Sequence, residues 1–387
     1  MIDKKQIAAW VKNKTITAEQ AEKMLTDATG KGREDKANKI VTAILTIGAL
    51  FFGIGAILFI ASNWSAMSSS FKTVVLFGST FGIFYLGFYL KYQNKKLPRV
   101  GESLIFLSSL LIGATIFLEA QIYNVDISSH ALALVWLAAI LPVALIFRSI
   151  PGAYLTCAVI IVWSLLYCFF SDSRSGIFND SWPWLPITLA LDGIFLFSAG
   201  GFSYLFSKLD GVARAFRLSG LGVFLLGFFL LTFKGFFETV PERFWQISVL
   251  LAVFSSLSVI FTVAALIKKV PKRTTAVIEH GLTLFYLFLI LMTFFLPTEG
   301  DPYPVLFNFA FVVLIVAMIY IGYINEDIKI INSSFFWLIL FVIARYFDFF
   351  WELLPRSIFF MAGGLVLVGG GAALEYYRRQ IKKTFKS

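Results

Sequence analysis

Long apolar runs dominate the sequence, and each is long enough to cross a lipid bilayer as a helix. A crossing takes about 20 predominantly apolar residues. Apolar residues make up 58% of the chain and charged residues 14%, a balance that excludes a water-soluble globular fold. We therefore predict an all-α polytopic integral membrane protein, a bundle of about twelve transmembrane helices. The predicted spans are 40–62, 72–90, 101–120, 130–147, 150–170, 184–206, 215–237, 244–267, 274–296, 304–324, 331–350 and 357–374.

Positive charges lie mainly on one side of this arrangement. If the N-terminus is cytoplasmic, the inner segments hold 27 of the 33 lysines and arginines, and the outer span ends hold 5. Cytoplasmic loops of membrane proteins carry such an excess of lysine and arginine. We therefore predict that both termini are cytoplasmic. The net charge of +10 then reflects topology and lipid contact, and no nucleic-acid partner is expected.

The chain divides into three predicted regions. Residues 1–39 form a short cytoplasmic helical hairpin, in which Thr17 and Gln20 have the spacing of a capping box. Residues 40–374 form the transmembrane bundle, with four helices in 40–147 and the remaining eight in 150–374, and residues 375–387 form a basic cytoplasmic tail.

Two basic loops, 95–99 and 268–273, lie six spans apart. This separation favours two halves of six spans each with the same orientation. The positive-inside rule also produces basic inner loops without any duplication, so both explanations stay open.

Motifs for metal, nucleotide and redox chemistry are absent from the sequence. Cys157 and Cys168 lie eleven positions apart in one apolar run, about 16 Å along a helix and beyond the reach of a disulfide. The two histidines, His130 and His280, belong to no zinc motif, and the chain has no phosphate-binding glycine loop. We therefore expect no metal site, no cofactor and no identifiable catalytic residue.

Polar residues within or beside the spans are the candidate functional residues, because such residues usually face the bundle interior or a water-filled cavity. Asp192 lies deepest on the outer side, eight positions into its span. One interpretation is a polar pocket that opens outward and binds substrate. Its candidate residues are Asp192, Glu119, Gln121, Arg345, Asp348, Asn63 and Trp64. Toward the inner side, Glu102, Glu279 and His280 are candidates for a proton relay.

A structural interpretation competes with this one. Arg345 and Asp348 share a helix face at i, i+3 and can neutralise each other, while Asn63 and Trp64 suit an interfacial anchor. We favour the structural interpretation for these residues and for His130, and weigh the two equally for Asp192. The glycines at Gly78–Gly82 and in 363–371 predict packing seams between helices.

Short motifs occur in a characteristic order along the first 150 residues and again near the C-terminus. They are 17–22 (TAEQAE), 48–60 followed by Ala61-Ser62-Asn63-Trp64, Glu102-Ser103-Leu104, Glu119-Ala120-Gln121-Ile122-Tyr123, Trp136 with Pro142, and Ala344–Asp348 before Gly363-Gly364 and the basic tail. This order resembles a prokaryotic family of predicted membrane proteins, domain of unknown function 2157. The resemblance covers about the first 150 residues, with 40–147 as the four-helix part, and, less fully, the C-terminal end.

The resemblance implies a bacterial cytoplasmic (inner) membrane protein and supplies no established activity. It implies that Asn63, Trp64, Glu102, Gln121 and Arg345 matter. It also raises the expectation of a partner, because such proteins are often paired with a second small membrane protein that has a Gly-Asp-Tyr signature.

Three functions stay open at this point. A carrier or flippase-like transporter of a small or lipid-like substrate is slightly favoured by the predicted span number, the short loops and Asp192, although the major-facilitator loop signature is missing from 91–101. The alternative is a non-catalytic scaffold or regulatory subunit that binds a second membrane or periplasmic protein. An enzyme that modifies lipids, with Glu119, His130 or Asp192 as acid or base, ranks lower because no nucleophile–base pair is identifiable. Membrane lipids are expected partners in each case.

Overall fold

The structure is a computed structural model. It describes residues 17, 20, 40–41, 43–55, 58–59, 67–125, 127–169, 184–206, 208–236, 244–267, 276–295, 302–350, 361, 363–365 and 368–372. All regular secondary structure within these ranges is helical. Asn63, Trp64, the predicted hairpin and the basic tail lie outside the described residues, apart from Thr17 and Gln20.

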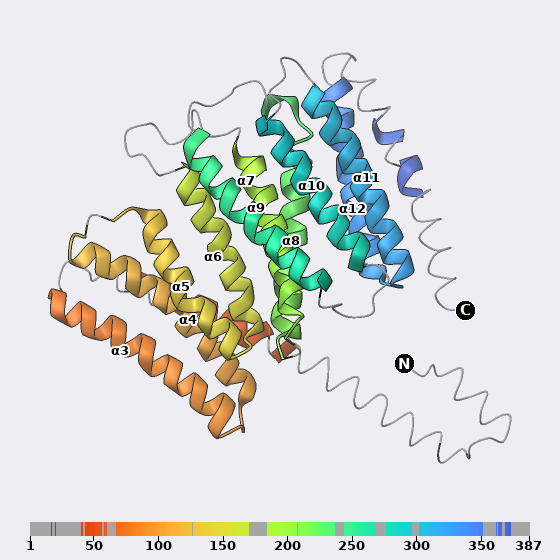
Figure 1. The fold of residues 1–387 in the computed structure, drawn as a ribbon. Coiled ribbons are helices and arrows are strands. Elements are labelled where there is room, and N and C mark those ends of the chain that lie inside the picture. The colour runs from red at the N-terminus through yellow and green to blue at the C-terminus, as the bar shows by residue number, and fades with distance from the viewer. Residues whose placement is uncertain are drawn as a thin grey trace. The chain divides into compact units, whose positions relative to one another are not determined.

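Nine helices of the described part are long and apolar enough to cross a membrane, judged by length and composition. They are α3 (Ser69–Phe88) with its π-helical extension η2 (Tyr89–Gln93), α4 (Pro98–Ile122), α5 (Ser129–Ile146), α6 (Ile150–Phe169), α7 (Trp184–Ser203), α8 (Asp210–Leu230), α9 (Phe244–Ile267), α11 (Pro302–Ile324) and α12 (Ile328–Phe350) (Figure 1). Three shorter apolar helices, Ala43–Gly55, Ile278–Thr293 within α10 (Ala276–Phe295) and Gly363–Ala372, coincide with the first, ninth and twelfth predicted spans. The all-α polytopic membrane architecture is therefore confirmed, while the orientation and the two six-span halves stay predictions.

The surface of α11 illustrates why these helices suit lipid rather than water. Its buried side includes Phe307 and Phe311, which are fully covered. Its other side exposes Val305, Phe309 and Val316 by 68, 71 and 59%. A helix that is apolar on all sides belongs in a membrane or in the core of a large protein. Because the uncovered side is as apolar as the covered one, hydrocarbon is the solvent that this helix fits.

Several helix ends follow from local sequence. Ser68 caps α3 by accepting a hydrogen bond from the Phe71 backbone N–H at 3.4 Å, and Pro98 begins α4 at a position where a missing N–H costs nothing. Arg148, in the short link between the fourth and fifth predicted spans, adopts a left-handed conformation with φ of 49° and ends α5. The two spans are thus separate helices, as predicted.

The capping box predicted in the N-terminal region is also present. The Thr17 N–H donates to Gln20 Oε1 at 3.0 Å, and the Gln20 N–H donates to Thr17 Oγ1 at 3.2 Å. These reciprocal bonds satisfy two backbone donors at the start of a helix.

The chain separates into two compact units. The first unit is Met1–Ile127 with Val135–Gly152, and the second unit is Ser128–Leu134 with Ala153–Ser387. In the first unit, α3 runs alongside α4 (Figure 1). Their backbones meet at one end, where a Cβ on Gly101 would lie 2.6 Å from the Lys91 backbone nitrogen. Only glycine permits this approach.

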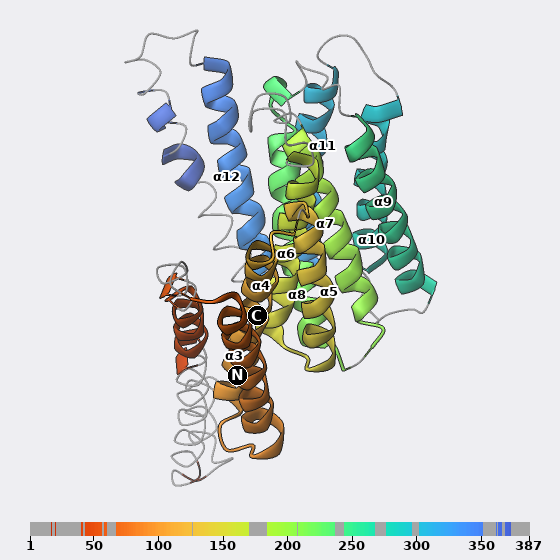
Figure 2. The same cartoon turned by 90° about the vertical axis from the view of Figure 1, so that its left-hand side faces the viewer.

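In the second unit, α7 and α8 are in contact along their whole length. Added Cβ atoms on Gly193, Gly220 and Gly227 would lie 2.3–2.4 Å from backbone nitrogens of the opposite helix, so the glycines form a continuous α7–α8 seam. Beside this pair, α9 lies next to α10 (Figure 2). At the packing seam predicted for Gly78 and Gly82, added Cβ atoms would meet no atom of the described chain within 4 Å, so the described helices form no seam there.

Candidate functional site

A groove in the first unit is lined by α3, α4 and α5. Its volume is about 490 Å³, and the rings of Phe77, Phe81 and Phe84 form much of its apolar wall. Two kinds of polar group interrupt the wall. Thr80 and Thr115 hydrogen-bond to each other across it, with hydroxyl oxygens 3.0 Å apart, and the Glu119 carboxylate lies farther along α4. The groove is therefore mainly apolar, with one acidic group.

Glu119 is held by neighbours that leave one of its oxygens available. The Thr73 hydroxyl donates to Glu119 Oε2 at 3.0 Å and lies 3.2 Å from the Tyr123 hydroxyl. Glu119 Oε1 is buried and has no hydrogen-bond partner among the described residues. Gln121, two residues later, has an exposed side chain and does not line the groove. Of the two predicted residues in this region, the structure thus brings only Glu119 to a cavity.

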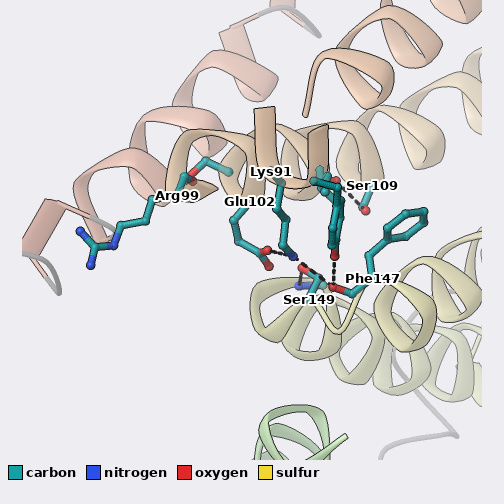
Figure 3. A network of polar contacts seen from close by, with 10 residues as sticks. Lys91, Arg99, Glu102, Ser109, Phe147 and Ser149 are labelled. Atoms are coloured by element: carbon teal, nitrogen blue, oxygen red, sulfur yellow. Dashed lines mark hydrogen bonds and ion pairs between the residues drawn. The ribbon is translucent and has the colours of Figure 1, made fainter. Parts of the chain in front are cut away.

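Glu102 belongs to a polar network at the opposite end of α4 (Figure 3). It forms an ion pair with Lys91, a residue of η2. Lys91 also donates to the Phe147 backbone carbonyl at 3.0 Å, and the Tyr92 hydroxyl donates to the same carbonyl at 2.8 Å. Figure 3 shows Arg99 pointing away from the pair. The lysine therefore neutralises Glu102 and also caps the C-terminal end of α5, where carbonyls attract cations.

Asp192 is the most enclosed of the predicted site residues. It lies on α7 with a fully buried side chain. Ser164 of α6 is its hydrogen-bond partner, with 2.5 Å between Ser164 Oγ and Asp192 Oδ2. Asp192 Oδ1 has no partner in the part of the chain that the structure describes. Among the described residues, no ion pair to Asp192 is formed.

Glu279 and His280, adjacent on α10, face different neighbours. Glu279 forms an ion pair with Arg217 of α8. The Arg217 guanidinium also lies 4.5 Å from the centre of the Phe197 ring. The His280 ring lies against Gly201 of α7, and no hydrogen bond joins it to Glu279 in the described chain. The proton relay stays a prediction, although both glutamates proposed for it already neutralise a cation.

Arg345 and Asp348 form the predicted i, i+3 pair, at 2.8 Å. Arg345 also donates to the Thr232 backbone carbonyl at 3.1 Å, and its guanidinium lies 4.4 Å from the centre of the Phe233 ring. The same Thr232 carbonyl accepts a second hydrogen bond, from the Asn308 side-chain amide at 2.9 Å. This cluster therefore ties α8, α11 and α12 together, which favours the structural interpretation of Arg345.

Within the second unit, the hydrogen bonds of Asp192 and those of Arg345 belong to different clusters. A single pocket that contains all predicted residues stays a prediction.

Sequence reasoning missed the partners Lys91, Arg217 and Ser164. Arg217 lies inside the predicted span 215–237, and a cation within a span signals an anionic partner. Ser164 carries no comparable signal. No group of three metal-ligating side chains occurs in the described residues.

Comparisons with known proteins identify the N-terminal region. No curated protein and no solved structure matches the chain. Residues 8–152 match a protein family described as predicted membrane protein (DUF2157), which confirms the resemblance found over the first 150 residues. The match ends at residue 152, which is also the last residue of the first unit. The chain is therefore a multi-helix membrane protein whose residues 8–152 match this family of unknown function.

Proposed function

We propose that this protein is a carrier for lipid-like amphiphiles and that the groove of the first unit binds the substrate. The groove is the observation that carries the proposal. Its volume, about 490 Å³, falls within the range of about 300–1,000 Å³ typical of small-molecule sites. Its aromatic wall suits an acyl chain, which needs apolar contact and no hydrogen bonds.

The acidic group in the groove suits the head of the same molecule. Glu119 Oε1 is buried without a partner among the described residues, and a buried carboxylate oxygen gains most from a cationic donor. A primary ammonium group supplies such a donor. An apolar wall with one carboxylate therefore matches an amphiphile that has an acyl chain and an amine-bearing headgroup.

Asp192 supports transport rather than static binding. Ionisable residues at membrane depth commonly mark substrate or ion pathways, and Asp192 is fully buried without an ionic partner in the described chain. We accordingly expect Asp192→Asn to abolish flux while the protein still folds.

A lipid-exchange assay with purified protein in liposomes tests the proposal. The probe is phosphatidylethanolamine that carries a fluorophore on one acyl chain, so that its amine stays free, and dithionite quenches the outer leaflet. We expect the wild-type protein to equilibrate the probe between leaflets. Ala139→Trp fills the groove and should reduce exchange to the level of protein-free liposomes, because Ala139 lines it. Ala138→Trp is the matched control, since the exposed side chain of Ala138 lies outside the groove.

Two further outcomes separate the headgroup contact from the competing function. Glu119→Gln should slow exchange of the amine-bearing probe more than that of a phosphatidylglycerol probe labelled in the same way. Equal exchange by the Ala138→Trp and Ala139→Trp variants would contradict the groove as the substrate site. Absence of exchange together with a stoichiometric second membrane protein in gentle extracts would favour the scaffold instead.

A further inference from the structure

The contacts around Asp192 need one more proton than is present if the Asp192 carboxylate is ionised. Ser164 Oγ lies 2.5 Å from Asp192 Oδ2 and 2.8 Å from the backbone carbonyl oxygen of Ile161. Both distances fall within the range of O–H···O bonds. A serine hydroxyl carries one proton and can donate it to only one of these two acceptors. With an ionised Asp192, one of the two close oxygen contacts would therefore lack a proton.

A protonated Asp192 removes this deficit. Its own O–H can donate to Ser164 Oγ, and the Ser164 hydroxyl is then free to donate to the Ile161 carbonyl. Each close contact then contains one proton, and Ser164 acts once as donor and once as acceptor, which its lone pairs allow. The same atoms and distances thus form a complete hydrogen-bonded chain from the carboxylic acid to the helix backbone.

The charges around Asp192 favour the neutral acid as well. On α6, the titratable side chains nearest to Ser164 are the Cys168 thiol and the Tyr167 phenol, and neither is a cation. The described part of α9, 248–267, contains no titratable residue. On α8 and α10 the charged groups nearest to α7 are Arg217, which lies against Gly200, its partner Glu279, and His280, which lies against Gly201, about 12 Å along the helix from Asp192. The Tyr286 phenol of α10, which packs against Phe224, is uncharged and donates to the Ala310 carbonyl.

Packing also closes the site to outside solvent, because the Asp192 side chain is 0% exposed. Asp192 precedes Gly193 of the α7–α8 seam, where an added Cβ would lie 2.3 Å from the Phe224 backbone nitrogen. A buried carboxylate without a cation is costly, whereas a neutral acid needs only hydrogen-bond partners. We infer that Asp192, with Ser164 and the Ile161 carbonyl, forms a proton-binding site in the second unit, occupied in this conformation. The site goes beyond the carrier proposal and would supply a proton as its coupling ion.

Infrared difference spectroscopy tests the site without any transport substrate. The protein is labelled with ¹³C-aspartate in lipid nanodiscs at neutral pH, and the carbonyl stretch of a protonated carboxylic acid is recorded. We expect this isotope-shifted band in the wild-type protein and its loss in Asp192→Asn, whose amide can still donate to Ser164. Asp210→Asn, which changes an exposed aspartate at the start of α8, is the matched control and should keep the band.

Ser164→Ala tests the hydrogen-bonded chain itself. Without Ser164 the Asp192 proton loses its acceptor, so the carbonyl band should move to higher frequency while the protein elutes as a single species. A wild-type spectrum that contains only ionised-aspartate bands would overturn the inference, even if Asp192→Asn fails to fold. An unshifted band in Ser164→Ala would overturn the role of Ser164. Neither result depends on lipid exchange, so failure here is distinguishable from failure of the carrier proposal.

Discussion

The α3–α4 pair of the first unit and the α7–α8 pair of the second begin alike and then differ. Each pair has a close glycine contact beside an ion pair. Gly101 lies against Lys91, which pairs with Glu102, and Gly200 lies against Arg217, which pairs with Glu279. Beyond this end, α7 and α8 stay in backbone contact along their length, whereas α3 and α4 leave the groove that α5 completes.

The difference shows how the spacing of small residues determines where two membrane helices pack closely and where a groove remains between them. Helices approach closely only where small residues remove side chains from the interface. The α7–α8 pair has such residues at each successive contact, so the two backbones stay close together. The α3–α4 pair has them at one end alone, and larger side chains hold the helices apart elsewhere. Apolar membrane helices thus produce both the buried Asp192 beside the α7–α8 seam and the open groove of the first unit.

The largest expected effect is on the ion pair of the second unit. Glu279→Gln leaves the Arg217 cation without its carboxylate, and removal of one partner of a buried pair costs about 3–5 kcal/mol. The free energy of unfolding, measured by SDS titration in mixed micelles, should fall accordingly. Glu102→Gln should cost less, because Lys91 keeps its hydrogen bond to the Phe147 carbonyl.

The double variant Arg217→Met with Glu279→Leu is the control for this prediction. It removes both charges and should recover most of the lost stability, because no unpaired charge remains. Equal losses for Glu279→Gln and Glu102→Gln would remove the distinction between the two ion pairs.

The α7–α8 seam is the next target. Gly193→Ala places a Cβ against the Phe224 backbone, which cannot move as a side chain can, and overpacking of this kind costs about 1–3 kcal/mol. The midpoint of thermal unfolding in detergent should fall. Gly222→Ala on α8 and Gly82→Ala on α3 are matched controls, because an added Cβ meets no described atom within 4 Å at either position. A loss of stability in all three variants would refute the seam as the cause.

A smaller effect is expected where α5 packs against α4. The Trp136 indole N–H donates to the Ser109 carbonyl at 3.0 Å, and the ring lies against Gly113. Trp136→Phe removes this hydrogen bond but keeps an aromatic ring, so the loss should be about 1 kcal/mol. SDS titration measures it. A loss well above about 1 kcal/mol would mean that the substitution also disturbs the packing of the ring against Gly113.

The smallest effect concerns the hydroxyl pair in the groove. Thr80→Val removes the hydrogen bond to Thr115 without changing the side-chain volume, and hydrogen bonds between membrane helices contribute about 0.6 kcal/mol on average. The free energy of unfolding should therefore hardly change, and lipid exchange should persist. Exchange that stops in Thr80→Val but survives Ala139→Trp would move the substrate away from the apolar wall.

The sequence predicted the helices better than their contacts. Hydropathy identified α3 to α9, α11 and α12, because bilayer thickness fixes the length of an apolar span whatever its neighbours. The spacing Gly78–Gly82 suggested a seam that the described helices do not form. The pairs Gly193/Gly200 and Gly220/Gly227 repeat at seven residues, the interval of helices that pack side by side, and that signal could have found the α7–α8 seam.

For the candidate site residues too, contacts within one helix were predictable from the sequence, whereas contacts between helices were not. The i, i+3 spacing of Arg345 and Asp348 sufficed to predict their ion pair, since one helix holds both residues. The pairs Lys91–Glu102 and Arg217–Glu279 join different elements, so their formation depends on how the helices pack.

The sequence by itself determined that this chain crosses the membrane as helices, since the apolar runs and the hydrogen-bonding needs of the backbone in lipid permit no other regular structure for them. It also identified Asp192 and Glu119 as the acids to explain. Only the tertiary structure decided that Asp192 is sealed against Ser164 while Glu119 lines a groove. The reason is that burial of a side chain depends on which helices approach it, and residues far apart in the chain set that approach.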